Sequence, residues 1–168
     1  MAADSLWKID KTVGVTVVTS GPGATNLITG IACSYFDSIP TIHITGQVNQ
    51  NEKTVYAGAK VRQAGFQETN IVDMVKPITK YSVQVTNGKE LKSELAKAYK
   101  IAVSGRMGPV LVDIPKDIQF AKTSYSKPKI QKKLNGKSLN QFSQKDIDQL
   151  IDLMNKSKKP IIYSGGGV

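Results

Sequence analysis

The stretch GVTVVTSGPGATNLITGIACSYF (14–36) decides the fold class, because a short apolar run passes through a glycine turn into a helical pattern. The run GVTVVTS (14–20) is rich in β-branched residues and bounded by glycine, which predicts a buried β-strand. Apolar residues then recur at helical spacing, at Leu27, Ile28, Ile31 and Tyr35. Ser20 or another loop oxygen could cap this helix, and Pro22 suits its first turn.

Beyond this stretch, the alternation of strand and helix continues to about residue 122. Short apolar runs predict strands over 41–48, 81–85 and 109–115. A short helix is expected over 71–75, and a longer one, capped by Asn87, from about 90 to 104. The longer helix is expected to bury Leu91, Leu95, Tyr99, Ile101 and Ala102. Near-continuous apolar strands between helices predict an α/β fold with a mostly parallel sheet flanked by helices.

In such a sheet, ligands bind beyond the carboxyl ends of the strands, which directs attention to the loops there. The loop SGPGATN (20–26) has the position of a phosphate-binding loop. It lacks the third glycine of a dinucleotide fingerprint and the lysine of a Walker loop, and Pro22 removes one N–H donor. We therefore expect it to pack a flat ligand rather than to wrap a diphosphate, with a plain tight turn as the alternative.

The net charge of +10 is unevenly distributed. Residues 118–145 contain seven lysines and no acidic residue, and we interpret 123–143 as a solvated linker. A non-catalytic binding module that uses 118–145 to hold nucleic acid or an acidic partner is an alternative. It is disfavoured because the segment has no Arg and only isolated aromatic residues. After the linker, Ser143 and Asp146 predict a capped helix, and 158–168 predict a strand that runs into a glycine turn. These would be the first helix and strand of a second α/β domain over 144–168.

Several classes of protein are excluded by composition. One Cys excludes a disulfide framework, and one His with it argues against a zinc site, so no metal ligands are assigned. His43 lies within an expected strand and is interpreted as structural. No apolar stretch is long enough to span a membrane and no signal peptide is evident, which predicts a cytoplasmic protein.

The chain resembles the acetolactate synthase-like group of thiamine diphosphate enzymes through five ordered motifs: GVTVVTSGPGATNLITGIACSYFDSIP, ITGQV, GFQETNIVDMVKPITKYS, GPVLVDIPKDIQ and KPIIYSGGGV. The resemblance implies that 1–122 form most of a pyrimidine-binding domain, truncated at its N-terminus, and that 144–168 begin a central domain. The complete enzyme would be a carboligase or decarboxylase acting on a 2-oxo acid such as pyruvate, and this chain alone would be inactive. Pyruvate oxidase and oxo-acid decarboxylase are alternatives within the family.

The same resemblance assigns site residues by position. Phe66 and Gln67 are the implied catalytic residues, facing the reacting carbon of the cofactor. Lys116 would line the substrate channel. The implied cofactor-binding residues are Pro22 and Asn26 for the aminopyrimidine ring, and Arg106, Gly165, Gly166 and Gly167 for FAD in members that bind it.

The resemblance also implies partners that this chain does not itself provide. Thiamine diphosphate would lie between two subunits of a homodimer or homotetramer, and its diphosphate and Mg²⁺ would be held by a separate domain. The essential glutamate of the family would fall about five residues before Met1, where its carboxyl group would act as an acid–base catalyst on the pyrimidine ring. The 17 residues between Val48 and Phe66 form a longer loop than is usual in the family, which leaves substrate and FAD open.

Overall fold

The computed structural model describes residues 1–52, 55–56, 59–122 and 143–165. Its core is a four-stranded sheet in the order β1-β2-β6-β5. The strands are β1 (Gly14–Val18), β2 (Thr41–Gln47), β5 (Tyr81–Gln84) and β6 (Val110–Pro115). Every neighbouring pair in this sheet is parallel. The predicted α/β fold with a parallel sheet is confirmed.

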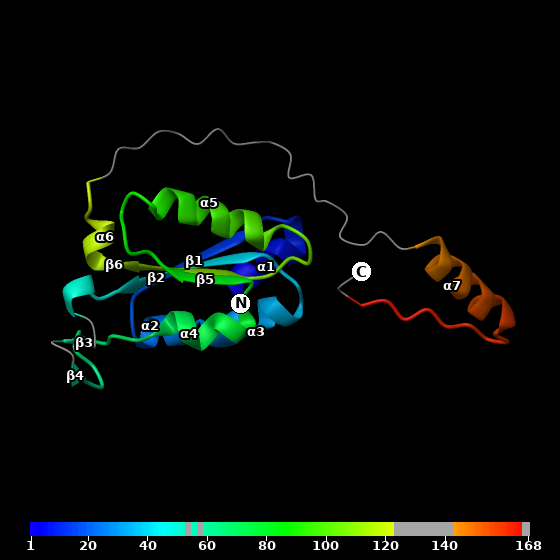
Figure 1. Ribbon diagram of the computed structural model, residues 1–168, viewed down its shortest axis with the longest axis horizontal. Helices are drawn as coiled ribbons and strands as arrows, with labels where there is room; N and C mark the ends of the chain where they lie inside the picture. The colour runs from blue at the N-terminus through cyan, green and yellow to red at the C-terminus, as the bar shows by residue number, and fades with distance from the viewer. Residues whose placement is uncertain (53–54, 57–58, 123–142, 166–168) are drawn as a thin grey trace.

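Helices cover both faces of the sheet (Figure 1). Helix α5 (Leu91–Ala102) lies on one face, and α2 (Pro22–Thr25), α3 (Ile28–Phe36) and α4 (Ile71–Val75) lie on the other. The central strand β6 supplies apolar side chains to both layers. Val110 and Val112 pack in the cluster that contains Ala98 and Ala102 of α5, whereas Leu111 packs with the helices opposite. Burial on both faces explains why β6 is apolar along most of its length.

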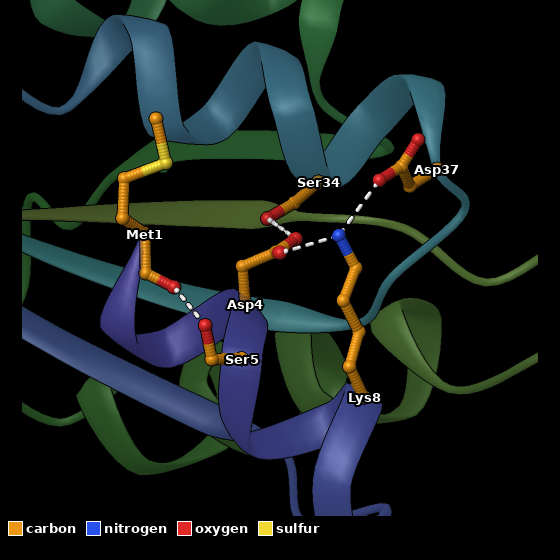
Figure 2. Close-up of polar contacts among 6 residues, drawn as sticks. All are labelled: Met1, Asp4, Ser5, Lys8, Ser34 and Asp37. Atoms are coloured by element: carbon orange, nitrogen blue, oxygen red, sulfur yellow. Dashed lines mark hydrogen bonds and ion pairs between the residues drawn. The ribbon is translucent and has the colours of Figure 1, made fainter.

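The first helix, α1 (Ala2–Asp10), is held against α3 by a buried carboxylate (Figure 2). Asp4 is only 6% exposed and accepts a hydrogen bond from the Ser34 hydroxyl, 3.2 Å away. The Lys8 ammonium lies 3.0 Å from Asp4 and 2.9 Å from Asp37, which follows α3. These polar contacts join the two helices.

Strand β1 differs from the sequence-based prediction of a buried strand. It lies at the edge of the described sheet, and Val15 and Val17 are 53% and 73% exposed. The register places these two residues beside Ile42 and Ile44 of β2, on the face covered by α5. Helix α5 packs over β2, β5 and β6, so the outer strand is left uncovered on that face.

Two predicted helix caps are also wrong. Gly21, which has no side chain to contribute, occupies the N-cap of α2 in place of Ser20. Helix α5 begins after Glu90, and Asn87 instead accepts a hydrogen bond from the Lys89 amide. Tyr99 is 44% exposed rather than buried, because the small residues Ala98 and Ala102 form the inward face of the helix.

The long loop after β2 contains structure that was not predicted. It includes the 3-10 turn η1 (Gln50–Glu52) and an antiparallel pair, β3 (Val55–Tyr56) with β4 (Ala59–Lys60). Helix α4 forms over the predicted residues and continues into the 3-10 turn η2 (Lys76–Ile78). Helix α6 (Lys116–Gln119) follows β6 directly.

The C-terminal segment contains the predicted helix, α7 (Gln144–Lys156), with the predicted capping box between Ser143 and Asp146. All described residues from 143 to 165 are exposed. The strand expected to run into the glycine turn of 158–168 does not form in 158–165, because a strand needs a pairing partner and none of the described residues provides one. The basic linker lies almost wholly outside the described residues. Among the described helices, none combines the length and apolar character needed to cross a membrane.

Candidate functional site

The candidate site lies at the carboxyl ends of the parallel strands, where Gly21 and Gln67 meet. Gly21 follows β1 and has a positive φ of 61°, a conformation that glycine adopts without strain. A Cβ atom on Gly21 would lie 2.6 Å from Cβ of Gln67 and 2.9 Å from its backbone oxygen. Only glycine permits this close approach, which joins the loop after β1 to the loop before α4.

Gln67 is itself in the left-handed region, with a φ of 56°, and its side chain is half-buried. The turn that carries it is braced from within, since Glu68 accepts hydrogen bonds from the amides of Ala64 and Gly65. Gly65 packs against Val48, because a Cβ atom added to Gly65 would lie 2.8 Å from the Val48 side chain. The neighbouring Phe66 is 82% exposed. This loop therefore holds Gln67 firmly and presents the Phe66 ring to solvent.

Pro22 and Asn26, the residues expected near the aminopyrimidine ring, lie on the same edge. Pro22 occupies the first turn of α2 and Asn26 caps the end of that helix. Both are exposed. Sequence reasoning placed Pro22, Asn26, Phe66 and Gln67 at one site, and the structure locates them at one edge of the sheet. The direct contact between the loop after β1 and the loop before α4 is made by Gly21, a residue that the sequence analysis did not assign to the site.

Lys116 begins α6 at the carboxyl end of β6 and is exposed. The adjacent Asp117 ties this helix to η1: its carboxylate accepts hydrogen bonds from the backbone amide of Gln50 at 3.3 Å and from its side-chain amide at 2.9 Å. The first residues after β2 and β6 are thereby held together. Lys116 follows the last paired residue of β6, so it takes no part in strand pairing. It lies at the same edge of the sheet as Gln67.

Beneath this edge lies a buried carboxylate that sequence reasoning missed. Asp113 is fully buried in β6 between Thr45 of β2 and Gln84 of β5, its partners in register. The Thr45 hydroxyl donates to Oδ1 at 2.6 Å, and the side-chain amides of Gln84 and Gln47 donate to Oδ2 at 2.6 and 3.3 Å. The available signal was a charged residue inside the otherwise apolar run VLVDIP.

His43 is structural, as predicted. Thr16 lies 2.8 Å from Nδ1 and Thr41 lies 2.9 Å from Nε2, so both ring nitrogens have hydroxyl partners. The ring is 3% exposed, and its burial lowers the pKa of His43 from 6.5 to about 4. A neutral, fully paired imidazole beneath the sheet surface does not fit an acid–base role at the site.

Arg106 lies at the opposite edge of the sheet, before the amino end of β6. Its Nε donates to the Ser38 hydroxyl at 2.8 Å. It lines a cavity of about 300 Å³ together with Tyr35, Phe36, Lys80 and Met107. Burial lowers the pKa of Lys80, whose ammonium donates at 2.5 Å to the carbonyl oxygens of Ile101 and Ser104 at the end of α5.

Of the glycines expected to share a ligand with Arg106, only Gly165 is described, and the structure does not bring it together with Arg106. Gly165 has no atom within 4 Å of an added Cβ, and Gly166 and Gly167 lie outside the described residues. Among the described residues, no three His, Cys, Asp or Glu side chains gather at a position that could hold a metal ion.

Comparison with known proteins gives a family match and several similar proteins. Residues 1–74 match the family model described as the thiamine pyrophosphate enzyme, N-terminal TPP binding domain; thiamine pyrophosphate is another name for thiamine diphosphate. The chain is 41% identical to an acetolactate synthase large subunit of Corynebacterium glutamicum, with 99% of the chain and 25% of the relative aligned. It is 40% identical to the acetolactate synthase isozyme 2 large subunit of Escherichia coli, over all of the chain and 28% of the relative. The chain thus spans about a quarter of the length of these relatives.

Proposed function

Since the chain belongs to the thiamine pyrophosphate enzymes, in their acetolactate synthase-like group, we propose that residues 1–122 form the pyrimidine-binding domain of such an enzyme. Residues 123–143 are then a linker, and 144–168 the beginning of a central domain. The family match over 1–74 and the parallel sheet with its glycine turn after β1 support this division.

The contact of Gly21 with Gln67 is the observation that carries the proposal. It brings the half-buried Gln67 side chain against the turn that leads into Pro22, and Asn26 lies one helical turn further along. These groups are neutral, and Pro22 offers no N–H, so they suit a flat heteroaromatic ring better than a diphosphate. We assign the aminopyrimidine ring of thiamine diphosphate to this edge, and its diphosphate and Mg²⁺ to another part of the enzyme.

When bound, thiamine diphosphate would supply a carbon nucleophile for addition to the carbonyl group of a 2-oxo acid. The residues of this chain bind and orient. Gln67, with its amide at the edge of the sheet, and Phe66, with its exposed ring, are assigned to the reacting end of the cofactor. Lys116, a cation at the same edge, is assigned to the path by which an anionic 2-oxo acid such as pyruvate enters.

The acid–base residue is not assigned to any of the carboxylates at this edge, because each has a partner within the chain. Glu68 accepts from the amides of Ala64 and Gly65, Asp117 binds Gln50, and Asp113 is buried beneath the site. We assign the complete enzyme to a homodimer or homotetramer, with FAD as a further cofactor of the Arg106 edge. Pyruvate oxidation or simple decarboxylation are the alternative reactions.

A domain exchange tests the proposal. The chain replaces the segment of the Escherichia coli isozyme 2 large subunit to which it aligns, and the product formed from pyruvate is identified with thiamine diphosphate and Mg²⁺ present. We expect acetolactate, with the unaltered subunit as the positive control. A folded chimera that binds thiamine diphosphate but does not consume pyruvate would refute the proposal. Acetaldehyde or acetate as the main product would favour one of the alternative reactions.

A further inference from the structure

We propose that Asp113 is a positioning residue, which fixes the placement of Gln67 at the edge of the sheet through Gln47 and Thr69. The four residues form one continuous path of hydrogen bonds from the buried centre of β6 to the loop before α4. The significance of this placement for turnover rests on the proposed function. The path itself is a property of this chain and is testable without a cofactor.

The path begins at a carboxylate with a fixed location. Asp113 is fully buried in the central strand, and donors from both neighbouring strands hold it: Thr45 on β2 and Gln84 on β5. A buried carboxylate surrounded by aligned donors has little freedom to move, because leaving any donor unpaired is costly. Asp113 is therefore a rigid reference point beneath the site.

Gln47 carries the path from the sheet to the loop. Its Nε2 donates to Oδ2 of Asp113 at 3.3 Å and to the backbone oxygen of Thr69 at 2.7 Å. Its Oε1 accepts from the Val48 amide at 3.1 Å. These partners fix the orientation of the Gln47 amide. If the amide were flipped, its oxygen would face the oxygens of Asp113 and Thr69, and its NH₂ group would face the Val48 N–H. Gln47 is buried, so water does not readily replace these contacts.

Thr69 completes the path. Its hydroxyl donates to the backbone oxygen of Gln67 at 3.3 Å. The same Gln67 oxygen faces Gly21, because a Cβ atom added to Gly21 would lie 2.9 Å from it. Gln67 is held in the left-handed conformation between these two neighbours, a state that non-glycine residues adopt only when their surroundings impose it. The Asp113 path is one of the constraints that impose it.

The experiment compares backbone NMR signals of Gln67 in the 168-residue chain and its variants. Asp113→Leu replaces the reference carboxylate by an apolar side chain with the same branching, and we expect the Gln67 amide and Cα signals to shift or broaden through exchange. Asp113→Asn is the conservative variant. Its amide oxygen can accept from Gln47 and Gln84 while its NH₂ group donates to the Thr45 hydroxyl, so we expect the parent signals to return.

A second pair of variants covers the case in which Asp113→Leu does not fold. Thr69 is only half-buried, so Thr69→Val should fold and should move the Gln67 signals, whereas Thr69→Ser keeps the hydroxyl and should leave them in place. Thr45→Val is the matched control, because it takes a donor from the same carboxylate on the side away from Gln47. It should lower the melting temperature without moving Gln67.

The proposal is overturned if Gln67 keeps its parent signals in Thr69→Val and in a folded Asp113→Leu variant. It is also overturned if Thr45→Val moves those signals as far as Asp113→Leu does, because the effect would then be general loss of stability. The proposed function fails differently: Gln67→Ala would leave turnover of the chimera unchanged while the Asp113 and Thr69 variants still move the Gln67 signals.

Discussion

Gly21 lies directly against Gln67, so closely that the Cβ of any other residue at position 21 would come 2.6 Å from the Gln67 Cβ. Replacing Gly21 by Ala should therefore both destabilise the chain and displace Gln67. The positive φ of 61° adds strain of about 1–3 kcal/mol for a non-glycine residue. Urea denaturation monitored by circular dichroism measures the loss. Gly165→Ala is the matched control, because an added Cβ there meets nothing within 4 Å, and it should cost under about 0.5 kcal/mol.

Replacing Gln67 by Ala in the domain-exchange chimera should lower kcat more than it weakens thiamine diphosphate binding. The amide is assigned to the reacting end of the cofactor, and an interaction made mainly in the transition state appears in kcat. We expect a loss of roughly tenfold or more, which corresponds to about 1.4 kcal/mol. Gln144→Ala on the exposed helix α7 is the control and should change neither constant. A collapse of cofactor affinity with unchanged kcat would show that the role of Gln67 has been misassigned.

His43 should make the stability of the chain depend on pH below neutrality. Its folded-state pKa of about 4 lies below the unfolded value of 6.5, so between these values the unfolded chain binds a proton that the folded chain does not. Stability is fully present above pH 6.5 and falls as the pH drops towards 4, by about 3 kcal/mol in all.

Urea midpoints measured from pH 7.5 to pH 4 test this, with His43→Gln as the comparison. Gln can hydrogen-bond both Thr16 and Thr41 but does not titrate, so its pH profile should be flatter over this range. Equal slopes in the two proteins, or an NMR titration of the His43 ring with a midpoint above pH 6, would contradict the assignment.

Asp4 should matter more to stability than Asp37, although both carboxylates bind Lys8. Asp4 is buried and also accepts from Ser34, so Asp4→Ala leaves a buried hydroxyl unpaired and should cost about 1–3 kcal/mol. The Asp37 side chain is 53% exposed, and its exposed ion pair should be worth less than about 1 kcal/mol. Thermal unfolding of the two alanine variants provides the comparison. Equal losses would mean that the Lys8 pairs, rather than the buried Asp4, hold α1 to α3.

The sequence was sufficient to predict the elements whose pattern is local. The β-branched runs at β1, β2 and β6 lie close to their predicted bounds, as do α4 and the capped helix α7. A motif order spread over the whole chain identified the family and directed attention to the carboxyl edge of the sheet. Both kinds of signal depend on residue type and spacing, which a sequence displays directly.

What the sequence did not predict depends on contacts between distant segments. The exposure of Val15 and Val17 follows from the place of β1 in the strand order, which a local apolar run does not reveal. The contact of Gly21 with Gln67 joins residues 46 positions apart in the chain. Likewise, Asp113 is explained only once Thr45 and Gln84 are known to flank it.

The separation of Arg106 from Gln67 sets a length scale for whatever this domain binds. Strand β6 lies between the two edges, and its six residues extend over roughly 20 Å at about 3.3 Å per residue. No small 2-oxo acid reaches both ends. A molecule in contact with both edges would need the extended dimensions of a dinucleotide, and anything shorter must choose between them. The length of β6 thus determines which ligands can contact both ends of the sheet, independently of their chemistry.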